Sequence, residues 1–296
     1  MTLAGALRRG REKLAGGASE TPALDALVLL SSVSGRDKAG IFAHCEEELE
    51  PEKEASYEKM LRLRLDGEPV SYILNYKEFF GLGFYVDERV LVPRPDTEAL
   101  VEAALDILRC APPVFRIHDV CTGTGCIPLA IAAALEGKIP EKSALDEKER
   151  VSVHISASDI SEEALEVFRL NCERILGRVL PHTRSTLLRG VQGGPFDMIT
   201  ANPPYLTQEE TAAMKAGGWP EPALALDGGK DGLQIINRLI EEAPAFLREG
   251  GYLLVEGADS QGEAIRRALC SAGWQDVRTL QDLGGQRRVV TARRGP

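Results

Sequence analysis

The pattern of apolar and polar positions changes near residue 75. Before that point apolar residues recur at helical spacing. Two amphipathic helices are expected there, one with Leu24, Leu27, Val28 and Leu30 and one with Tyr57, Met60, Leu61, Leu63 and Leu65. Residues 76–95 alternate loosely and contain Gly81 and Gly83, which indicates a β-hairpin. The pattern therefore predicts a helical domain over residues 1–75, a hairpin connector over 76–95 and a larger domain over 96–296.

In the larger domain, strand-like apolar runs alternate with helical patterns. A helix is expected over Thr97–Cys110 with Asp96 as its N-cap. From Arg116 onward the alternation predicts a parallel sheet with crossover helices. The last two expected strands, 277–280 and 287–291, are joined by a short glycine turn and should be antiparallel. The fold class is therefore α/β.

A glycine-rich turn follows the first buried strand of this domain. Residues 115–120 run into Cys121-Thr122-Gly123-Thr124-Gly125, and an apolar helix starts near Cys126. Glycines at a strand-to-helix turn let a ligand approach the backbone closely. Dinucleotide-binding turns have Gly or Ala where this chain has Pro128, which weakens a nicotinamide reading without eliminating it.

An acidic residue ends the next strand. Asp159 follows the run 151–158 and is placed to bind ribose hydroxyls, but it lies 34 residues after Gly125. The usual spacing is ~20 residues. Residues 138–150 form a charged stretch of 13 residues that resembles a surface insertion, and without it the spacing falls to 21. The corrected spacing fits a ribose-binding acid.

A third motif, Asn202-Pro203-Pro204-Tyr205, follows the apolar run 196–201. Each proline fixes φ and contributes a carbonyl without an N–H. The Asn202 oxygen and the Pro203 carbonyl could accept the two hydrogens of an –NH2 group on a flat, conjugated carbon, with Tyr205 against its plane. Holding both hydrogens would free the nitrogen lone pair to attack an electrophile. Taken alone, the motif is equally compatible with a rigid loop.

The three motifs in this order are more specific than any of them alone. A glycine turn and a ribose acid indicate an adenosyl cofactor, and the Asn-Pro-Pro-Tyr segment places an amino-group trap beside it. The combination predicts S-adenosylmethionine as cofactor and nitrogen methylation as the reaction.

The chain resembles the release-factor glutamine methyltransferases, the HemK/PrmC family, over most of its length. Besides the motifs above, the resemblance rests on the segments 67–74, 78–81, 92–98, 221–229, 231–233, 261–264, 282–285 and 288–289. It implies a seven-stranded class I S-adenosylmethionine-dependent methyltransferase sheet with a small N-terminal helical domain that recognises the substrate. It also implies methylation of the side-chain amide nitrogen of the glutamine in the Gly-Gly-Gln motif of peptide-chain release factors.

The resemblance also assigns site residues. Those expected at the cofactor are Cys121, Thr122, Gly123, Thr124, Gly125, Asp159, Leu187 and Asn202. Those expected to hold the glutamine are Asn202, Pro203, Pro204 and Tyr205, with Asn202, Pro203 and Tyr205 acting in catalysis. The chain departs from the pattern at Cys121, where release-factor enzymes usually have Gly, and at Leu187, where an aromatic residue is frequent near the adenine.

Composition limits the alternatives. The net charge of −10 disfavours a nucleic-acid substrate, because unspecific binding of phosphates requires a basic surface. Glutamine methylation of a ribosomal protein and, less favourably, adenine amino-methylation stay open. The six cysteines and four histidines have no metal-ligand spacing, so no metal site is expected. With no signal-peptide core and no long apolar stretch, we expect a cytoplasmic monomer without membrane contact.

Overall fold

The computed structural model describes residues 1–17, 19–139, 152–282 and 284–296. The charged stretch expected as an insertion lies almost entirely outside these residues. Two compact units are present: Met1–Tyr76 with Ala216–Pro220, and Lys77–Lys215 with Glu221–Pro296. The sequence expectation had placed a connector between residues 76 and 95; a short antiparallel hairpin, β1 (Lys77–Phe79) and β2 (Leu82–Phe84), begins the second unit.

The first unit is helical around a small apolar core. Its helices are α1 (Leu3–Leu14), α2 (Pro22–Ser34), α3 (Lys38–Ala43), α4 (Pro51–Leu65) and α5 (Val70–Leu74). Pro22 starts α2 at its first turn, where its missing N–H has no effect on helix hydrogen bonding. The buried Tyr57 of α4 donates a hydrogen bond to the Ala26 carbonyl of α2 at 3.1 Å, which joins the two helices.

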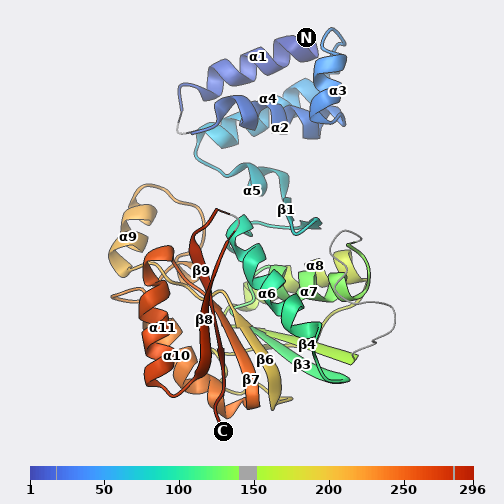
Figure 1. Cartoon of the computed structure of the whole chain (residues 1–296). Coiled ribbons are helices and arrows are strands. Elements are labelled where there is room, and N and C mark those ends of the chain that lie inside the picture. Colours follow the sequence, from blue (N-terminus) through green and yellow to red (C-terminus); the bar gives the residue numbers. More distant parts are fainter. Residues whose placement is uncertain (18, 140–151, 283) are drawn as a thin grey trace. The chain divides into compact units, whose positions relative to one another are not determined.

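The second unit is a seven-stranded sheet with helices on both faces (Figure 1). The strands are β3 (Val114–Val120), β4 (Ser152–Asp159), β5 (His182–Arg184), β6 (Phe196–Ala201), β7 (Leu247–Glu256), β8 (Gln275–Gln281) and β9 (Arg287–Arg293). Their order is β5-β4-β3-β6-β7-β9-β8, and β9 alone runs antiparallel to its neighbours. The expected α/β fold and the antiparallel last pair are confirmed.

The helices of this unit divide between the two faces. They are α6 (Glu98–Leu108), α7 (Cys126–Leu135), α8 (Glu162–Leu176), α9 (Gln208–Ala216), α10 (Gln234–Glu242) and α11 (Gly262–Ser271). Successive strand residues enter opposite cores: Met198 packs with α6, α7 and α8, whereas Ile199 packs with α10 and α11. All six residues of β6 are buried, as expected for a central parallel strand covered on both sides.

The expected N-cap of α6 is wrong. Pro95 starts a short 3₁₀ turn, Pro95–Thr97, so Asp96 lies inside that turn and Thr97 precedes the helix. The Asp96 carboxylate instead pairs with Arg288 of β9 at 3.1 Å. Proline at the first position of the turn shifts the helix start by one residue, because its fixed φ already has a helical value.

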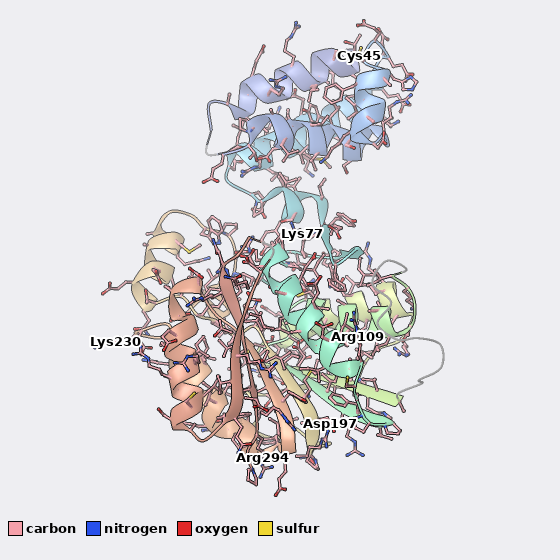
Figure 2. The ribbon with its side chains drawn as sticks, in the orientation of Figure 1. Cys45, Lys77, Arg109, Asp197, Lys230 and Arg294 are labelled. Carbon is pink, nitrogen blue, oxygen red and sulfur yellow. The ribbon has the colours of Figure 1, made fainter. Side chains whose placement is uncertain are left out.

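The amino ends of the central strands are tied together by Asp197. Its Oδ2 accepts the backbone N–H of Arg116 at 2.7 Å, and its Oδ1 pairs with Arg248. Asp197 and Arg294 mark this end of the sheet in Figure 2. The ligand-binding motifs predicted from the sequence all lie at the opposite, carboxyl end of the strands, where open parallel sheets bind ligands.

Candidate active site

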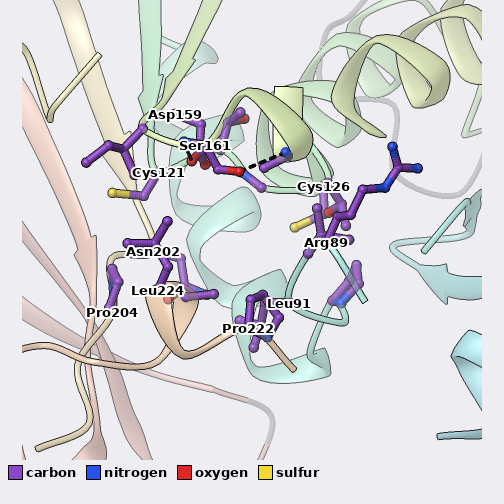
Figure 3. A pocket seen from close by; sticks show the side chains of 18 of the residues that line it. Arg89, Leu91, Cys121, Cys126, Asp159, Ser161, Asn202, Pro204, Pro222 and Leu224 are labelled. Atoms are coloured by element: carbon purple, nitrogen blue, oxygen red, sulfur yellow. Dashed lines mark hydrogen bonds between the residues drawn. The ribbon is translucent and has the colours of Figure 1, made fainter. Parts of the chain in front are cut away.

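A cavity of about 480 Å³ lies at the carboxyl ends of β3, β4 and β6. Its lining comes from six segments of the second unit, within residues 88–94, Thr97, 121–127, 159–164, Asn202 with Pro204, and 222–225. In the view of Figure 3, Asp159 and Ser161 lie above, Leu91 and Pro222 below, and Asn202 to one side between them. The volume is in the ~300–1,000 Å³ range of small-molecule sites.

The glycine-rich turn forms one wall of the cavity. Cys121 and Gly125 both have positive φ, 59° and 80°. Gly125 also lies so close to α8 that a Cβ there would be 2.5 Å from Phe168 Cδ2. The left-handed conformation explains why glycine suits position 121, and Cys121 adopts it with a side chain.

Asp159 ties the turn to β4. Its Oδ2 accepts the Gly123 N–H at 2.9 Å and its Oδ1 accepts the Ser161 N–H at 3.0 Å. Burial raises the pKa of this carboxyl above its ordinary value, and the backbone N–H groups oppose that shift. Each oxygen of an ionised carboxylate can accept a second hydrogen bond, so Asp159 keeps acceptor capacity for two ribose hydroxyls.

The two thiols beside the turn are unreactive. Burial raises the pKa of Cys126 to about 12 and that of Cys121 well above its ordinary value, and nearby carboxylates add to both shifts. Because the thiolate is the nucleophile, neither residue is suited to redox or covalent chemistry. In the described part of the chain, no group of three or more His, Cys, Asp or Glu residues is arranged to hold a metal ion.

Asn171 of α8 fixes the turn from behind and was not foreseen from the sequence. This fully buried amide donates to the Thr124 carbonyl at 3.0 Å and to the Tyr85 carbonyl at 3.1 Å, and it accepts the Tyr85 N–H at 2.7 Å. It therefore joins the glycine turn to the segment that leads into residues 88–94 of the cavity wall.

Glu221 connects two segments of the opposite wall of the cavity. It accepts the Val92 N–H at 2.9 Å and pairs with the Arg94 guanidinium at 2.6 Å. Arg94 and the adjoining Pro222 both line the cavity. The buried carboxylate thus connects two lining segments that lie about 130 residues apart in the sequence.

The Asn-Pro-Pro-Tyr segment enters the cavity at Asn202 and Pro204. Asn202 Nδ2 donates to Thr97 Oγ1 at 3.2 Å. Pro203 is buried and Tyr205 half-buried, and neither lines the cavity. The Pro203 carbonyl receives no backbone hydrogen bond from the described residues.

The segment from Gly228 to Gly232 cradles this motif. A Cβ on Gly228 would lie 2.7 Å from the Pro204 oxygen and 2.8 Å from Tyr205 Cα. Gln261 Nε2 donates to the Tyr205 carbonyl at 2.9 Å. Such close approach of two backbones requires glycine at position 228. Two segments of the family resemblance, 221–229 and 261–264, thereby hold the motif in place.

The residues at the turn fit an adenosyl group. Besides Asp159, Thr122, Gly123 and Thr124 line the cavity at this turn, and the Thr122 side chain lies close enough to Asp119 to lower the pKa of that carboxyl by hydrogen bonding. Asp119 below it accepts from Thr200 at 2.6 Å, and burial raises its pKa to about 7. Leu187, expected at the adenine, is buried with a positive φ of 53° and does not line the cavity.

The seven-stranded sheet with this cavity defines a class I, S-adenosylmethionine-dependent methyltransferase. A solved methyltransferase from Pyrococcus furiosus has the same fold: TM-score 0.50, 22% identity, covering 74% of this chain and 92% of that chain. Residues 5–74 match the family described as the PrmC N-terminal domain.

Similarity to characterised relatives extends over nearly the whole chain. The release factor glutamine methyltransferase of Escherichia coli K12 is 35% identical over 276 residues, which cover 93% of this chain and 94% of the relative. The enzyme of that name from Koribacter versatilis is 34% identical over 298 residues, 99% of each chain. The chain belongs to the release factor glutamine methyltransferase family.

Proposed function

We propose that this enzyme methylates the side-chain amide nitrogen of the glutamine in the Gly-Gly-Gln motif of peptide-chain release factors. The observation that carries the proposal is the position of Asn202, which lines the cavity from the end of β6 while its Nδ2 donates away to Thr97. Its Oδ1 is therefore available as an acceptor for an incoming –NH2 group. The relatives named above supply the substrate class.

S-adenosylmethionine, when bound, supplies an electrophilic methyl group on a sulfonium. Thr122, Gly123, Thr124 and Asp159, which line the cavity, would hold the cofactor, and Asp159 would accept hydrogen bonds from its ribose hydroxyls. Asn202 Oδ1 and the Pro203 carbonyl each accept one N–H of the glutamine amide and orient its nitrogen. No residue need remove a proton before attack, because transfer of the methyl group leaves a positively charged nitrogen, which then loses a proton to water. Positioning of this kind supplies up to ~7–11 kcal/mol.

Tyr205 acts as an apolar support for the substrate and not as a base. Burial, followed by the nearby Glu256 carboxylate, raises the pKa of its hydroxyl to about 12. The phenol therefore stays protonated throughout the working pH range.

No helix in the part of the chain that the structure describes is long and apolar enough to cross a membrane. We place the reaction in the cytoplasm, with a monomeric enzyme and without a nucleic-acid substrate.

The test is transfer of labelled methyl to purified release factor by wild-type enzyme and by Asn202→Ala. We expect turnover to fall about 10²–10³-fold, as when one preorganised polar group is removed from an active site. Asn237→Ala, on α10 away from the cavity, is the matched control. Turnover near the wild-type value in Asn202→Ala would refute the role of Asn202. Transfer to ribosomal protein or DNA in preference to release factor would refute the substrate.

A further inference from the structure

A buried carboxylate lies directly behind Asn202. In the parallel pair of β6 and β7, Ala201 is opposite Val255, so Asn202 and Glu256 follow at the same level of the sheet. Glu256 is 1% exposed and does not line the cavity. Its Oε2 has no hydrogen-bond partner among the described residues. A carboxyl group buried in this way without a fixed partner requires an explanation.

The groups around Glu256 explain why this carboxyl group is buried there. Thr97 and Asn202 lie close enough to lower the pKa of its carboxyl by hydrogen bonding, and the Arg288 charge lowers it further. Burial outweighs these effects and, together with the Asp96 charge, raises the pKa to about 7. Arg288 is itself engaged by Asp96 at 3.1 Å, so it does not neutralise Glu256 alone. Thr97 and Asn202 are the uncharged donors that face the carboxylate.

The donors form a chain that ends at Glu256. Asn202 Nδ2 donates to Thr97 Oγ1, and a hydroxyl that accepts in this way keeps its own proton for a second acceptor. The Glu256 carboxylate is the acceptor that the lowering effect of Thr97 on its pKa indicates. An amide side chain takes the orientation that its hydrogen-bond network imposes. With its Nδ2 directed at Thr97, and with Glu256 at the same level of the neighbouring strand, Asn202 presents its oxygen on the other side.

We propose that Glu256 and Thr97 are positioning residues, which hold the Asn202 amide with its oxygen toward the cavity. The reversed amide would present two N–H donors to the –NH2 group of the substrate, and transfer would lose one of its two acceptors. The inference rests on the proposed role of Asn202. It adds that the acceptor orientation is imposed by an ionised carboxylate outside the cavity.

Glu256→Gln is the first test, because glutamine keeps the shape of glutamate and can donate a hydrogen bond to Thr97. Such a bond would reverse the direction of the hydrogen bonds that run from Asn202 through Thr97 to Glu256. We expect kcat for release factor to fall about 10–100-fold, the range found for residues that orient metal ligands from behind. The Kd for S-adenosylmethionine should stay within about twofold, because Glu256 lies outside the cavity. Glu263→Gln, the same change on the exposed side of α11, is the matched control.

Thr97 provides an independent pair of variants. Thr97→Val removes the hydroxyl and should lower kcat to a similar extent, whereas Thr97→Ser restores a hydroxyl and should recover most of it. A packing role would predict the opposite order, since valine fills the space of threonine better than serine does. Equal kcat in the two variants, or a lower kcat for serine, would overturn the inference.

The pH profile gives a readout that a merely structural role would not change. The kcat of the wild type should rise with pH through about 7 as Glu256 ionises, and Glu256→Gln should lack this inflection. Other groups that face Glu256 are Asp96, Arg288, Tyr205 and Cys126. The pKa values of Tyr205 and Cys126 are raised to about 12, far from neutrality. Asp119 also has a pKa of about 7, so the readout is the difference between the two profiles. A pH profile of Glu256→Gln that matches the profile of the wild type would refute the positioning role.

The two proposals fail differently. If Asn202→Ala keeps wild-type turnover, the proposed role of Asn202 is wrong. If Asn202→Ala loses turnover while Glu256→Gln and Thr97→Val keep the kcat and pH profile of the wild type, the role of Asn202 stands and the positioning inference is wrong.

Discussion

Replacing Asp159, at the end of β4, with alanine should weaken cofactor binding. Both carboxylate oxygens already accept one backbone N–H, at 2.9 and 3.0 Å, which fixes their direction before the cofactor arrives. Each keeps one further acceptor site for a ribose hydroxyl. A hydrogen bond to a charged group contributes ~1.5–3 kcal/mol. Loss of one such bond corresponds to about one to two orders of magnitude in Kd. Because Asp159→Ala removes both bonds, its Kd should rise by at least that much.

Titration calorimetry with S-adenosylmethionine measures this effect directly. Asp37→Ala is a suitable control, because Asp37 also accepts a backbone N–H, from Gly40 at 2.7 Å, but belongs to the helical unit. The affinity of the wild type should also weaken as the pH falls toward the raised pKa of Asp159, because protonation removes the charge from both hydrogen bonds. Unchanged affinity in Asp159→Ala would refute the ribose-binding role.

Three further outcomes are expected. Gly228→Ala should lower turnover about 10²-fold with cofactor affinity retained, because its Cβ would displace the backbone of the Asn-Pro-Pro-Tyr segment. Turnover equal to that of the wild type would contradict this prediction. In urea unfolding, Gly125→Ala should be less stable than Gly123→Ala by ~1–3 kcal/mol, since both have positive φ but only Gly125 meets Phe168. Burial lowers the pKa of His118 to about 4, so the unfolded state binds its proton more readily, and this contribution to stability is lost as pH falls from 6.5 toward 4. Between pH 7 and 5 the wild type should therefore lose about 2 kcal/mol relative to His118→Gln, and parallel profiles would contradict the assignment.

The sheet and its motifs could be predicted because their signals are local. The run 196–201 is mostly apolar and lies between Pro195 and Pro203, and it forms the central strand β6. The glycine turn and Asp159 each follow such a run, and parallel topology brings the carboxyl ends of the strands together. Their meeting at one cavity follows from strand order alone.

The faces of the N-terminal helices were predicted less well. Leu24 is 47% exposed and Leu63 39% exposed, although both fall on the expected apolar faces. Helices α1 to α5 enclose a core too small to cover every apolar position, so only residues such as Leu29, Leu30 and Leu61 are buried. Helical periodicity identifies the apolar face of a helix, but it does not show how many residues on that face are buried.

The residues that hold the site from behind had no local signal. Thr97 meets Asn202 across 105 residues, and Asn171 meets Tyr85 across 86. A single polar residue in an apolar helix or strand has no periodic pattern that reveals its partner. Glu256 could have been found, since it ends the strand next to β6 and so lies at the same edge of the sheet as Asn202.

The central claim is that the two acceptors recognise the –NH2 group of a release-factor glutamine. The most direct test is labelled methyl transfer to folded release factor carrying Gly-Gly-Gln, compared with the same protein carrying Gly-Gly-Glu. We predict transfer to the first and none to the second, because a carboxylate has no N–H for Asn202 and Pro203 and places a charge against them. Transfer to DNA or RNA adenine, with none to the release factor, would contradict the account.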